Sequence, residues 1–218
     1  MSIQYFEPKD RPYGLTYGQW TIKWWQWLLQ IPKDKNPALD ETGKNIEISQ
    51  NNDYVSFLTG TFVNTIKTPH RIVTLPAGRA ILIAIINYQA NFMEDSMFKN
   101  ESELKNHVIN DIKDIVRHEV LIDNKKLEDG VYRVGSDPSL FPVKIAANIP
   151  HGVNGIPYGV NGVDDGSISS SAGITQAVAD GYWIFLKPPP VGKYKIDLFG
   201  ACTGGVRKIE AHYTINLV

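Results

Sequence analysis

Apolar residues recur at helical spacing near the start of the chain. One side of this segment is formed by Trp20, Trp24, Trp27 and Ile31. The opposite side carries Gln19, Lys23, Gln26 and Gln30. Thr16 and Gln19 have the spacing of a capping box, and Pro32 stops the pattern. We therefore predict a helix over residues 17–31.

This predicted helix is apolar around more than half of its circumference, because Tyr17, Ile22 and Trp25 widen the apolar stripe. It must be buried, either against a sheet or against another subunit. Two other interpretations are an aromatic platform for a sugar and an anchor on a membrane surface. Lys23 is the only cation on the polar side, which disfavours the membrane anchor.

Beyond residue 37 the pattern changes to short segments rich in aromatic and β-branched residues. We predict strands over residues 54–62, 71–75, 79–88, 119–122, 131–134, 141–147, 182–186, 193–198 and 208–217. Residues 79–88 do not alternate, which is typical of a strand buried on both faces, and residues 71–75 precede them as a hairpin-like partner. The last two strands alternate between apolar and polar positions. One-sided burial without a β-α-β rhythm predicts a mainly β chain, an antiparallel β-sandwich of jelly-roll or immunoglobulin-like type.

One helix interrupts the strands. Asn100 and Glu103 have capping-box spacing and an apolar face follows, so we predict a helix over residues 100–117. Residues 150–172 are rich in Gly, Asn, Asp and Ser and predict a long loop. Long loops inside compact domains are usually functional or flexible. With 218 residues the chain is expected to form a single β-sandwich domain, residues 1–218.

Charge and cysteine content narrow the classes of partner. The chain has 22 Lys+Arg and 23 Asp+Glu, a net charge of −1. It therefore lacks the basic surplus that is typical of nucleic-acid-binding proteins, and no nucleic-acid partner is expected. No apolar run reaches the roughly 18 residues that span a bilayer, so no transmembrane segment is expected. The single cysteine, Cys202, permits no internal disulfide. The N-terminus lacks the pattern of an export signal, which predicts a cytoplasmic protein.

Two groups of side chains are candidate metal ligands. His107, Asp111, Asp114 and His118 would share one face of the inserted helix, but over roughly 16 Å, too far to hold one ion together. A solvated helix face explains them better. In the loop, Asp164 and Asp165 offer the oxygen ligands that Ca²⁺ prefers, near Asn154 and Asn161. Turn formation explains the same residues equally, so bound Ca²⁺ is the alternative to a plain turn, and no other cofactor is expected.

Sequence signatures of catalysis are missing. The chain has no Gly-x-Ser-x-Gly elbow, no His-Glu-x-x-His motif and no phosphate-binding loop. Cys202 could pair with His212 or His151, but its turn setting gives no visible activation. Glu210 and His212 share the polar face of the last strand with nearby Arg207 and Lys208; this face is either a ligand groove or an exposed strand surface.

Several segments together resemble a widespread family of uncharacterised, often exported microbial proteins. They are 17–27 (YGQWTIKWWQW), 57–62 (FLTGTF), 75–78 (LPAG), 85–87 (IIN), 132–134 (YRV) and 179–183 (ADGYW). The resemblance spans most of the chain and implies a shared architecture; no activity is attached to the family, so it transfers no catalytic residue. Exported relatives carry cysteines near the positions of Ile46 and Val73. Either this copy is intracellular, or its cysteines were lost or replaced.

Three functional hypotheses follow. The first is a non-enzymatic binding or assembly module that recognises a small ligand, a glycan or another copy of the chain. Its predicted ligand-binding residues are His151, Asn154, Tyr158, Asn161 and Trp183. The second is a hydrolytic or metal-dependent enzyme that uses His151, Asp164 and Asp165 together with Asn87 or Glu94. The third is a structural subunit of a homo-oligomer, in which the apolar helix packs between copies.

Overall fold

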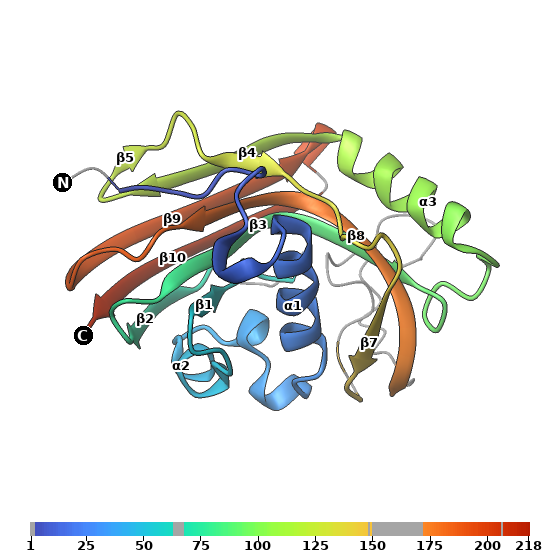
Figure 1. Ribbon diagram of the computed structural model, residues 1–218, viewed down its shortest axis with the longest axis horizontal. Coiled ribbons are helices and arrows are strands. Elements are labelled where there is room, and N and C mark those ends of the chain that lie inside the picture. Colours follow the sequence, from blue (N-terminus) through green and yellow to red (C-terminus); the bar gives the residue numbers. More distant parts are fainter. Residues whose placement is uncertain (1–2, 63–67, 148, 150–171, 206) are drawn as a thin grey trace.

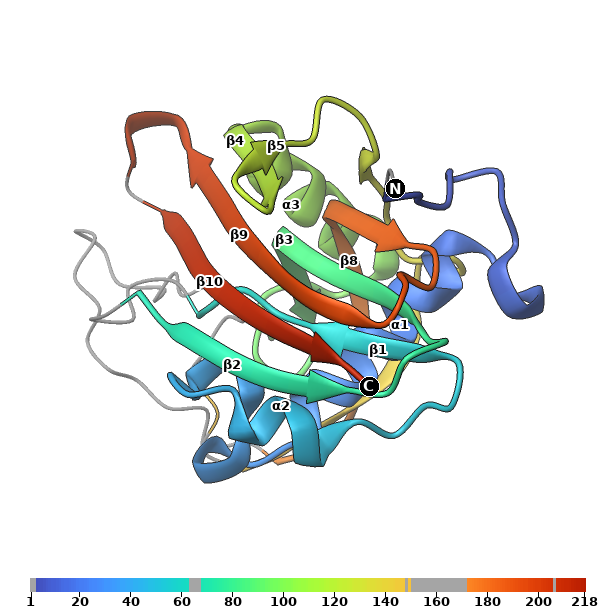
Figure 2. The ribbon, with the colours of Figure 1, turned by 90° about the vertical axis from the view of Figure 1, so that its left-hand side faces the viewer.

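The structure is a computed structural model that describes residues 3–62, 68–147, 149, 172–205 and 207–218. These residues form two five-stranded sheets (Figure 1, Figure 2). The central sheet contains β1 (Val55–Leu58), β3 (Ala80–Asn91), β8 (Gly173–Leu186) and β6 (Val131–Arg133) in that order, with β7 (Phe141–Ile145) also paired to β8. The outer sheet contains β2 (His70–Leu75), β10 (Lys208–Leu217), β9 (Gly192–Cys202), β4 (Ile115–Ile122) and β5 (Lys125–Lys126).

Three α-helices accompany the sheets in the described residues: α1 (Tyr17–Leu29), α2 (Lys44–Ser49) and α3 (Glu101–Lys113). Short 3-10 turns occupy Pro12–Gly14, Lys33–Lys35, Pro37–Leu39 and Thr203–Gly205. The capping box of α1 is present, since Gln19 N donates to Thr16 Oγ1 and Thr16 N donates to Gln19 Oε1. Asn100 caps α3 through its side chain, whose Oδ1 accepts from Glu103 N at 3.1 Å, while Glu103 Oε2 accepts from Lys99 N and not from Asn100 N. The N-terminal and inserted helices are thus confirmed, whereas α2 was not predicted.

The central sheet is covered on both faces, which explains why every residue of β3 is buried. One face packs against the outer sheet, and aliphatic residues such as Ile83, Leu198 and Ile215 form that core. The other face lies under α1, and aromatic residues form that core (Figure 1). Trp20, Trp24, Trp25 and Trp27 are each no more than 2% exposed. The mainly β sandwich is confirmed, and the tryptophans of α1 pack within this chain.

The strands are not all antiparallel, contrary to the expectation from sequence. β1 runs parallel to β3, and β2 runs parallel to β10. The predicted hairpin of 71–75 and 79–88 is wrong, because β2 belongs to the outer sheet and β3 to the central one. Their burial gives the physical reason. β2 alternates between exposed and buried positions, as an outer strand does, whereas β3 is buried on both faces.

The inserted helix is shorter than predicted. α3 ends at Lys113, and β4 begins at Ile115 and pairs with β9. Ile115 and Val116 are β-branched and favour a strand once an edge is available for pairing. His118 therefore lies on β4, so the predicted helix face of His107, Asp111, Asp114 and His118 does not exist.

A buried arginine joins β2 to the segment that follows β1. Arg71 is 1% exposed, and its guanidinium donates to the carbonyl oxygens of Asp40, Thr59 and Gly60 and to Tyr213 Oη. Burial raises the pKa of Tyr213. The buried guanidinium is thus hydrogen-bonded to backbone carbonyl oxygens and to a hydroxyl group inside the fold. Ile46 on α2 and Val73 on β2 are also fully buried, in the core where α2 packs on β2.

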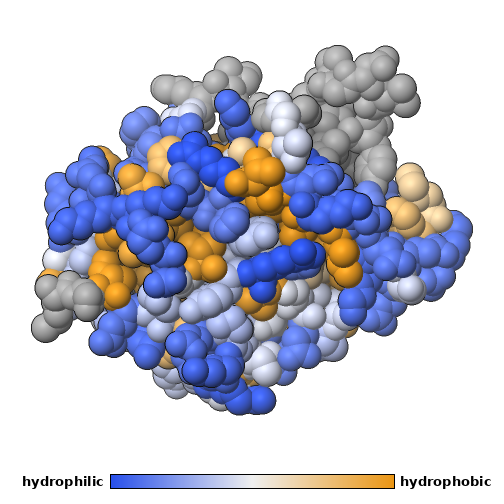
Figure 3. Space-filling view, turned by 90° about the horizontal axis from the view of Figure 1, so that it is seen from above, coloured by the Kyte–Doolittle hydropathy of each residue, from blue (hydrophilic) through white to orange (hydrophobic). Residues whose placement is uncertain are grey.

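From above, over β4 and β5 of Figure 1, the surface is largely hydrophilic, with apolar side chains in separate patches (Figure 3). In the described part of the chain, no helix is both long enough and apolar enough to cross a membrane.

Candidate functional site

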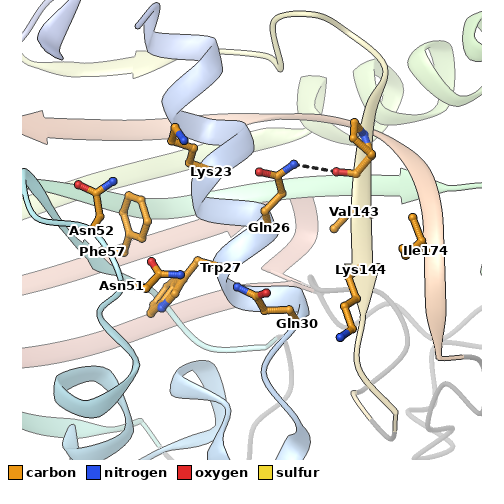
Figure 4. Close-up of a pocket in the computed structure, with 11 residues that line it drawn as sticks. Lys23, Gln26, Trp27, Gln30, Asn51, Asn52, Phe57, Val143, Lys144 and Ile174 are labelled. Carbon is orange, nitrogen blue, oxygen red and sulfur yellow. Dashed lines mark hydrogen bonds between the residues drawn. The ribbon is translucent and has the colours of Figure 1, made fainter. Parts of the chain in front are cut away.

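A groove of about 430 Å³ opens beside the C-terminal half of α1 (Figure 4). It lies between the segment that leads into β1 and strand β7. Its described lining residues are Lys23, Gln26, Trp27, Gln30, Asn51, Asn52, Phe57, Pro142, Val143, Lys144 and Ile174. They come from four regions far apart in the sequence, so the groove exists only in the folded chain.

The burial of the tryptophans determines which side of α1 faces this groove. Because the apolar side of the helix covers the central sheet, Lys23, Gln26 and Gln30 turn outward. Gln26 Nε2 donates to the Pro142 carbonyl oxygen at 2.8 Å and ties α1 to β7. In Figure 4 the carbonyl oxygen of Gln26 lies on the other side, away from β7. The Gln26 amide is thus held with its acceptor toward the groove.

Asn52 is held in place by a local turn. Its Oδ1 accepts hydrogen bonds from the backbone N–H groups of Tyr54 and Val55, at 2.9 and 3.0 Å. This fixes the amide plane, and Figure 4 places the amide nitrogen on the side of Phe57. Asn52 therefore presents a donor to the groove, opposite the acceptor of Gln26.

Two aromatic rings form the base of the groove. Trp27 and Phe57 lie 5.4 Å apart between centroids and are each 1% exposed. Trp27 Nε1 donates to the Ser49 carbonyl oxygen at 2.8 Å, so the indole is already satisfied. The base is therefore closed, and a ligand would contact mainly the polar rim.

The charged side chains on the described rim of the groove are both cations. Lys23 and Lys144 are exposed, and within the described residues neither forms an ion pair. None of the described lining residues is Asp, Glu, His or Cys. The groove thus offers cations and amides but no described general base or nucleophile, an arrangement suited to binding an anionic or polar ligand.

An exposed pair of tyrosines adjoins the same segment. Tyr13 and Tyr54 are 43% and 60% exposed, and their rings stack with centroids 5.2 Å apart. Tyr13 has φ 54°, the left-handed region that bulky residues avoid at a cost of roughly 1–3 kcal/mol. An edge contact with Trp20, at 6.1 Å, helps to hold it. The fold therefore maintains a strained tyrosine at the surface.

The outer face of the outer sheet carries a second polar cluster. His212 Nδ1 lies 2.6 Å from Asp197 Oδ1, and its Nε2 lies 3.2 Å from Glu210 Oε1. The His70 ring stacks on His212 with centroids 4.7 Å apart. Glu210 and His212 therefore share an exposed strand face. Arg207 turns away from this face to Asp111 of α3, at 3.5 Å.

All of the site residues predicted from the loop lie outside the described residues. These are His151, Asn154, Tyr158, Asn161, Asp164 and Asp165. Trp183 is described and is fully buried in the aromatic core. Its Nε1 donates to the Val134 carbonyl oxygen at 3.2 Å, and its ring packs against Trp24.

The other candidate metal ligands are divided between two elements, although His107 Nε2 and Asp111 Oδ2 remain 3.8 Å apart on α3. His107 stays on α3, where it contacts Tyr88 Oη at 2.9 Å. His118 stacks on Tyr182, and burial lowers its pKa. Within the part of the chain that the structure describes, no group of three or more His, Cys, Asp or Glu side chains is placed to hold a metal ion.

Cys202 faces the aliphatic core, and burial raises the pKa of its thiol. His212 lies on the opposite, outer face of the same sheet, so the two cannot form a thiol–base pair. Glu94 and Asn91 bind each other at 2.6 Å, between Glu94 Oε2 and Asn91 Nδ2. Asn87, the other proposed partner of the loop, is 4% exposed.

The sequence patterns did not predict the groove. The signal that could have found it is the narrow polar side of α1, where Lys23, Gln26 and Gln30 follow one another along an otherwise buried helix. Asn51, Asn52 and Lys144 gave no separate signal, because only the fold brings them next to α1.

No protein-family model matches the chain, and no curated protein does. A solved structure entitled "Solution Structure of Amebosin" shows 11% sequence identity over 77% of this chain and 100% of that chain, with a TM-score of 0.25. A TM-score this low supports no argument about fold or function.

Proposed function

We propose that this protein is a non-enzymatic binding module whose groove between α1 and β7 holds an acidic, polar ligand. The observation that carries the proposal is the composition of the rim: Lys23 and Lys144 without a described counter-ion, among amides in fixed orientations. Anionic groups would meet two cations, and hydroxyl or amide groups would meet Gln26, Gln30 and Asn52.

The alternatives fit these residues less well. A hydrolase would need a base or nucleophile at the groove, and the described lining supplies none. A structural subunit was suggested by the apolar surface of α1, but that surface is covered by the central sheet of the same chain. The loop of residues 150–172 was the predicted ligand-binding segment, whereas the described lining of the groove comes from residues 23–30, 51–57 and 142–144 and from Ile174.

Charge reversal tests the proposal. The probes are hexagalacturonate, a sugar oligomer with a carboxylate on each ring, and the peptide hexaglutamate. Isothermal titration calorimetry at low ionic strength should detect binding of at least one. In the variant Lys23→Glu/Lys144→Glu we expect roughly 100-fold weaker binding, because two favourable charge interactions become repulsive. Added salt should also weaken binding to the native protein.

A matched control lies on the outer sheet. Lys193→Glu/Lys208→Glu makes the same change in net charge at two exposed lysines away from the groove. Binding should stay within about twofold of the native value, since distant charges are screened. Equal losses in the two double variants, or no binding of either anion, would contradict the proposal.

A further inference from the structure

We infer that the ligand of this groove is an acidic oligosaccharide, with one sugar ring packed on the exposed face of Tyr54. This inference rests on the proposed function and specifies its ligand class. Two further features of the molecule support it: the strand edges beside the groove are occupied, and a pair of tyrosines lies at the surface.

The edges beside the groove are closed to an extended peptide. The backbone of Phe57 in β1 is already paired with Gln50, whose Nε2 donates to Phe57 O at 2.9 Å and whose Oε1 accepts from Phe57 N at 2.8 Å. On β7, Pro142 O accepts from Gln26, and Ala146 N just beyond the strand donates to Leu29 O at 2.8 Å. Adding a peptide strand would break these bonds.

The groove also lacks a place for a large apolar anchor. Peptide recognition usually depends on an aromatic or aliphatic side chain inserted into a pocket. Here Trp27 and Phe57 close the base. A sugar ring needs no such pocket, because its hydroxyl groups hydrogen-bond to amides around its edge. Gln26 offers an acceptor and Asn52 a donor, and a sugar hydroxyl group can bind to either.

Tyr54 supplies the flat surface that a sugar ring requires. One of its faces stacks on Tyr13, and 60% of the residue is exposed, which leaves surface of the side chain available to a ligand. Asn52 accepts from the Tyr54 N–H, and its Cα lies at most about 7 Å from that of Tyr54, so the platform and the groove rim belong to one segment. Stacking on Tyr13 holds the ring in place, which limits the entropy lost on binding.

The cations at the groove indicate that the sugar carries carboxylates. Lys23 projects from α1 and Lys144 from β7, on separate walls of the groove (Figure 4). A neutral oligosaccharide would leave both ammonium groups unpaired. An oligosaccharide with a carboxylate on each ring can meet both cations while another ring reaches Tyr54.

Calorimetry with three probes and two variants tests this inference. The probes are hexagalacturonate, the neutral maltohexaose and hexaglutamate; the variants are Tyr54→Ala, which removes the ring, and Tyr54→Phe, which keeps it. We expect hexagalacturonate to bind at least tenfold more tightly than the other two. Tyr54→Ala should weaken that binding by roughly three- to tenfold, and Tyr54→Phe should stay within about twofold.

The outcomes separate this inference from the proposed function. If hexaglutamate binds as tightly as hexagalacturonate and Lys23→Glu/Lys144→Glu abolishes both, the anion-binding groove stands and the sugar is overturned. If Tyr54→Ala binds hexagalacturonate like the native protein, the tyrosine platform is overturned. If no anion binds, the inference and the proposed function both fail.

Discussion

The groove and the outer face of the outer sheet are both polar, but they compensate their charges differently. On the outer sheet, Glu119 accepts from Arg117 and Lys126, and His212 lies between two carboxylates. At the groove, Lys23 and Lys144 have no ion pair among the described residues. A surface that satisfies its own charges gains little from a charged partner, whereas one with unpaired cations gains much.

Arg71 is a buried cation whose partners all lie inside the fold, and its removal should have the largest effect on stability. Arg71→Leu leaves the carbonyl oxygens of Asp40 and Gly60 and the hydroxyl oxygen of Tyr213 without this donor. The Thr59 carbonyl oxygen keeps only the hydrogen bond from the Tyr213 hydroxyl. We expect the free energy of unfolding to fall by about 3–5 kcal/mol, measured by urea denaturation. Lys193→Leu, at an exposed cation, should change it by less than about 0.5 kcal/mol. A loss below 1 kcal/mol for Arg71→Leu would show that the buried network does not stabilise the fold.

Single charge reversals on the two surfaces should have opposite consequences. Arg117→Glu breaks the ion pair with Glu119 and the contact with the Phe199 ring, 4.4 Å from the guanidinium carbon. It should lower the stability by roughly 1.5 kcal/mol and leave hexagalacturonate binding unchanged. Lys23→Glu should leave stability within about 0.5 kcal/mol and weaken binding roughly tenfold. Thermal melts measure the stability of both variants, and calorimetry measures their binding of hexagalacturonate. If both variants lose stability, or if both lose binding, the two surfaces do not differ in the way described.

Asn52 allows folding and binding to be separated at one residue. Asn52→Ala removes the acceptor for the Tyr54 and Val55 N–H groups and should cost about 1 kcal/mol of stability. Asn52→Asp keeps that acceptor, so stability should be retained. The added carboxylate, however, should repel an anionic ligand and weaken its binding by more than Asn52→Ala does. If Asn52→Asp binds hexagalacturonate like the native protein, Asn52 does not face the ligand.

The smallest expected effect is the pH dependence of the stability that Glu119 contributes on the outer sheet. Hydrogen bonds from Lys126 and Arg117 lower the pKa of Glu119 below its usual 4.5. A lowered pKa in the folded state stabilises the protein above the unfolded pKa, and this contribution is lost as the pH falls through the lowered value. Glu119→Gln should therefore destabilise by a few tenths of a kcal/mol at pH 7 and by nothing near pH 2. A difference that persists at pH 2 would point to packing rather than charge.

Local patterns in the sequence predicted the elements that local interactions define. The capping box of α1 and the alternation of β10 depend on neighbouring residues, and both are present. The assignment of β2 and β3 to different sheets depends on what covers each face. The end of α3 likewise depends on pairing of β4 with β9. The groove could not be predicted, because only the folded chain brings β7 beside the polar side of α1.

The central claim is that an acidic ligand binds beside α1 and not on the outer sheet. The most direct test is a map of backbone amide NMR shifts during titration with hexagalacturonate. We predict that the signals of Gln30, Asn52 and Lys144 move together and saturate, while those of His70 and His212 stay in place. Shifts confined to His70 and His212, with an unchanged groove, would contradict the claim.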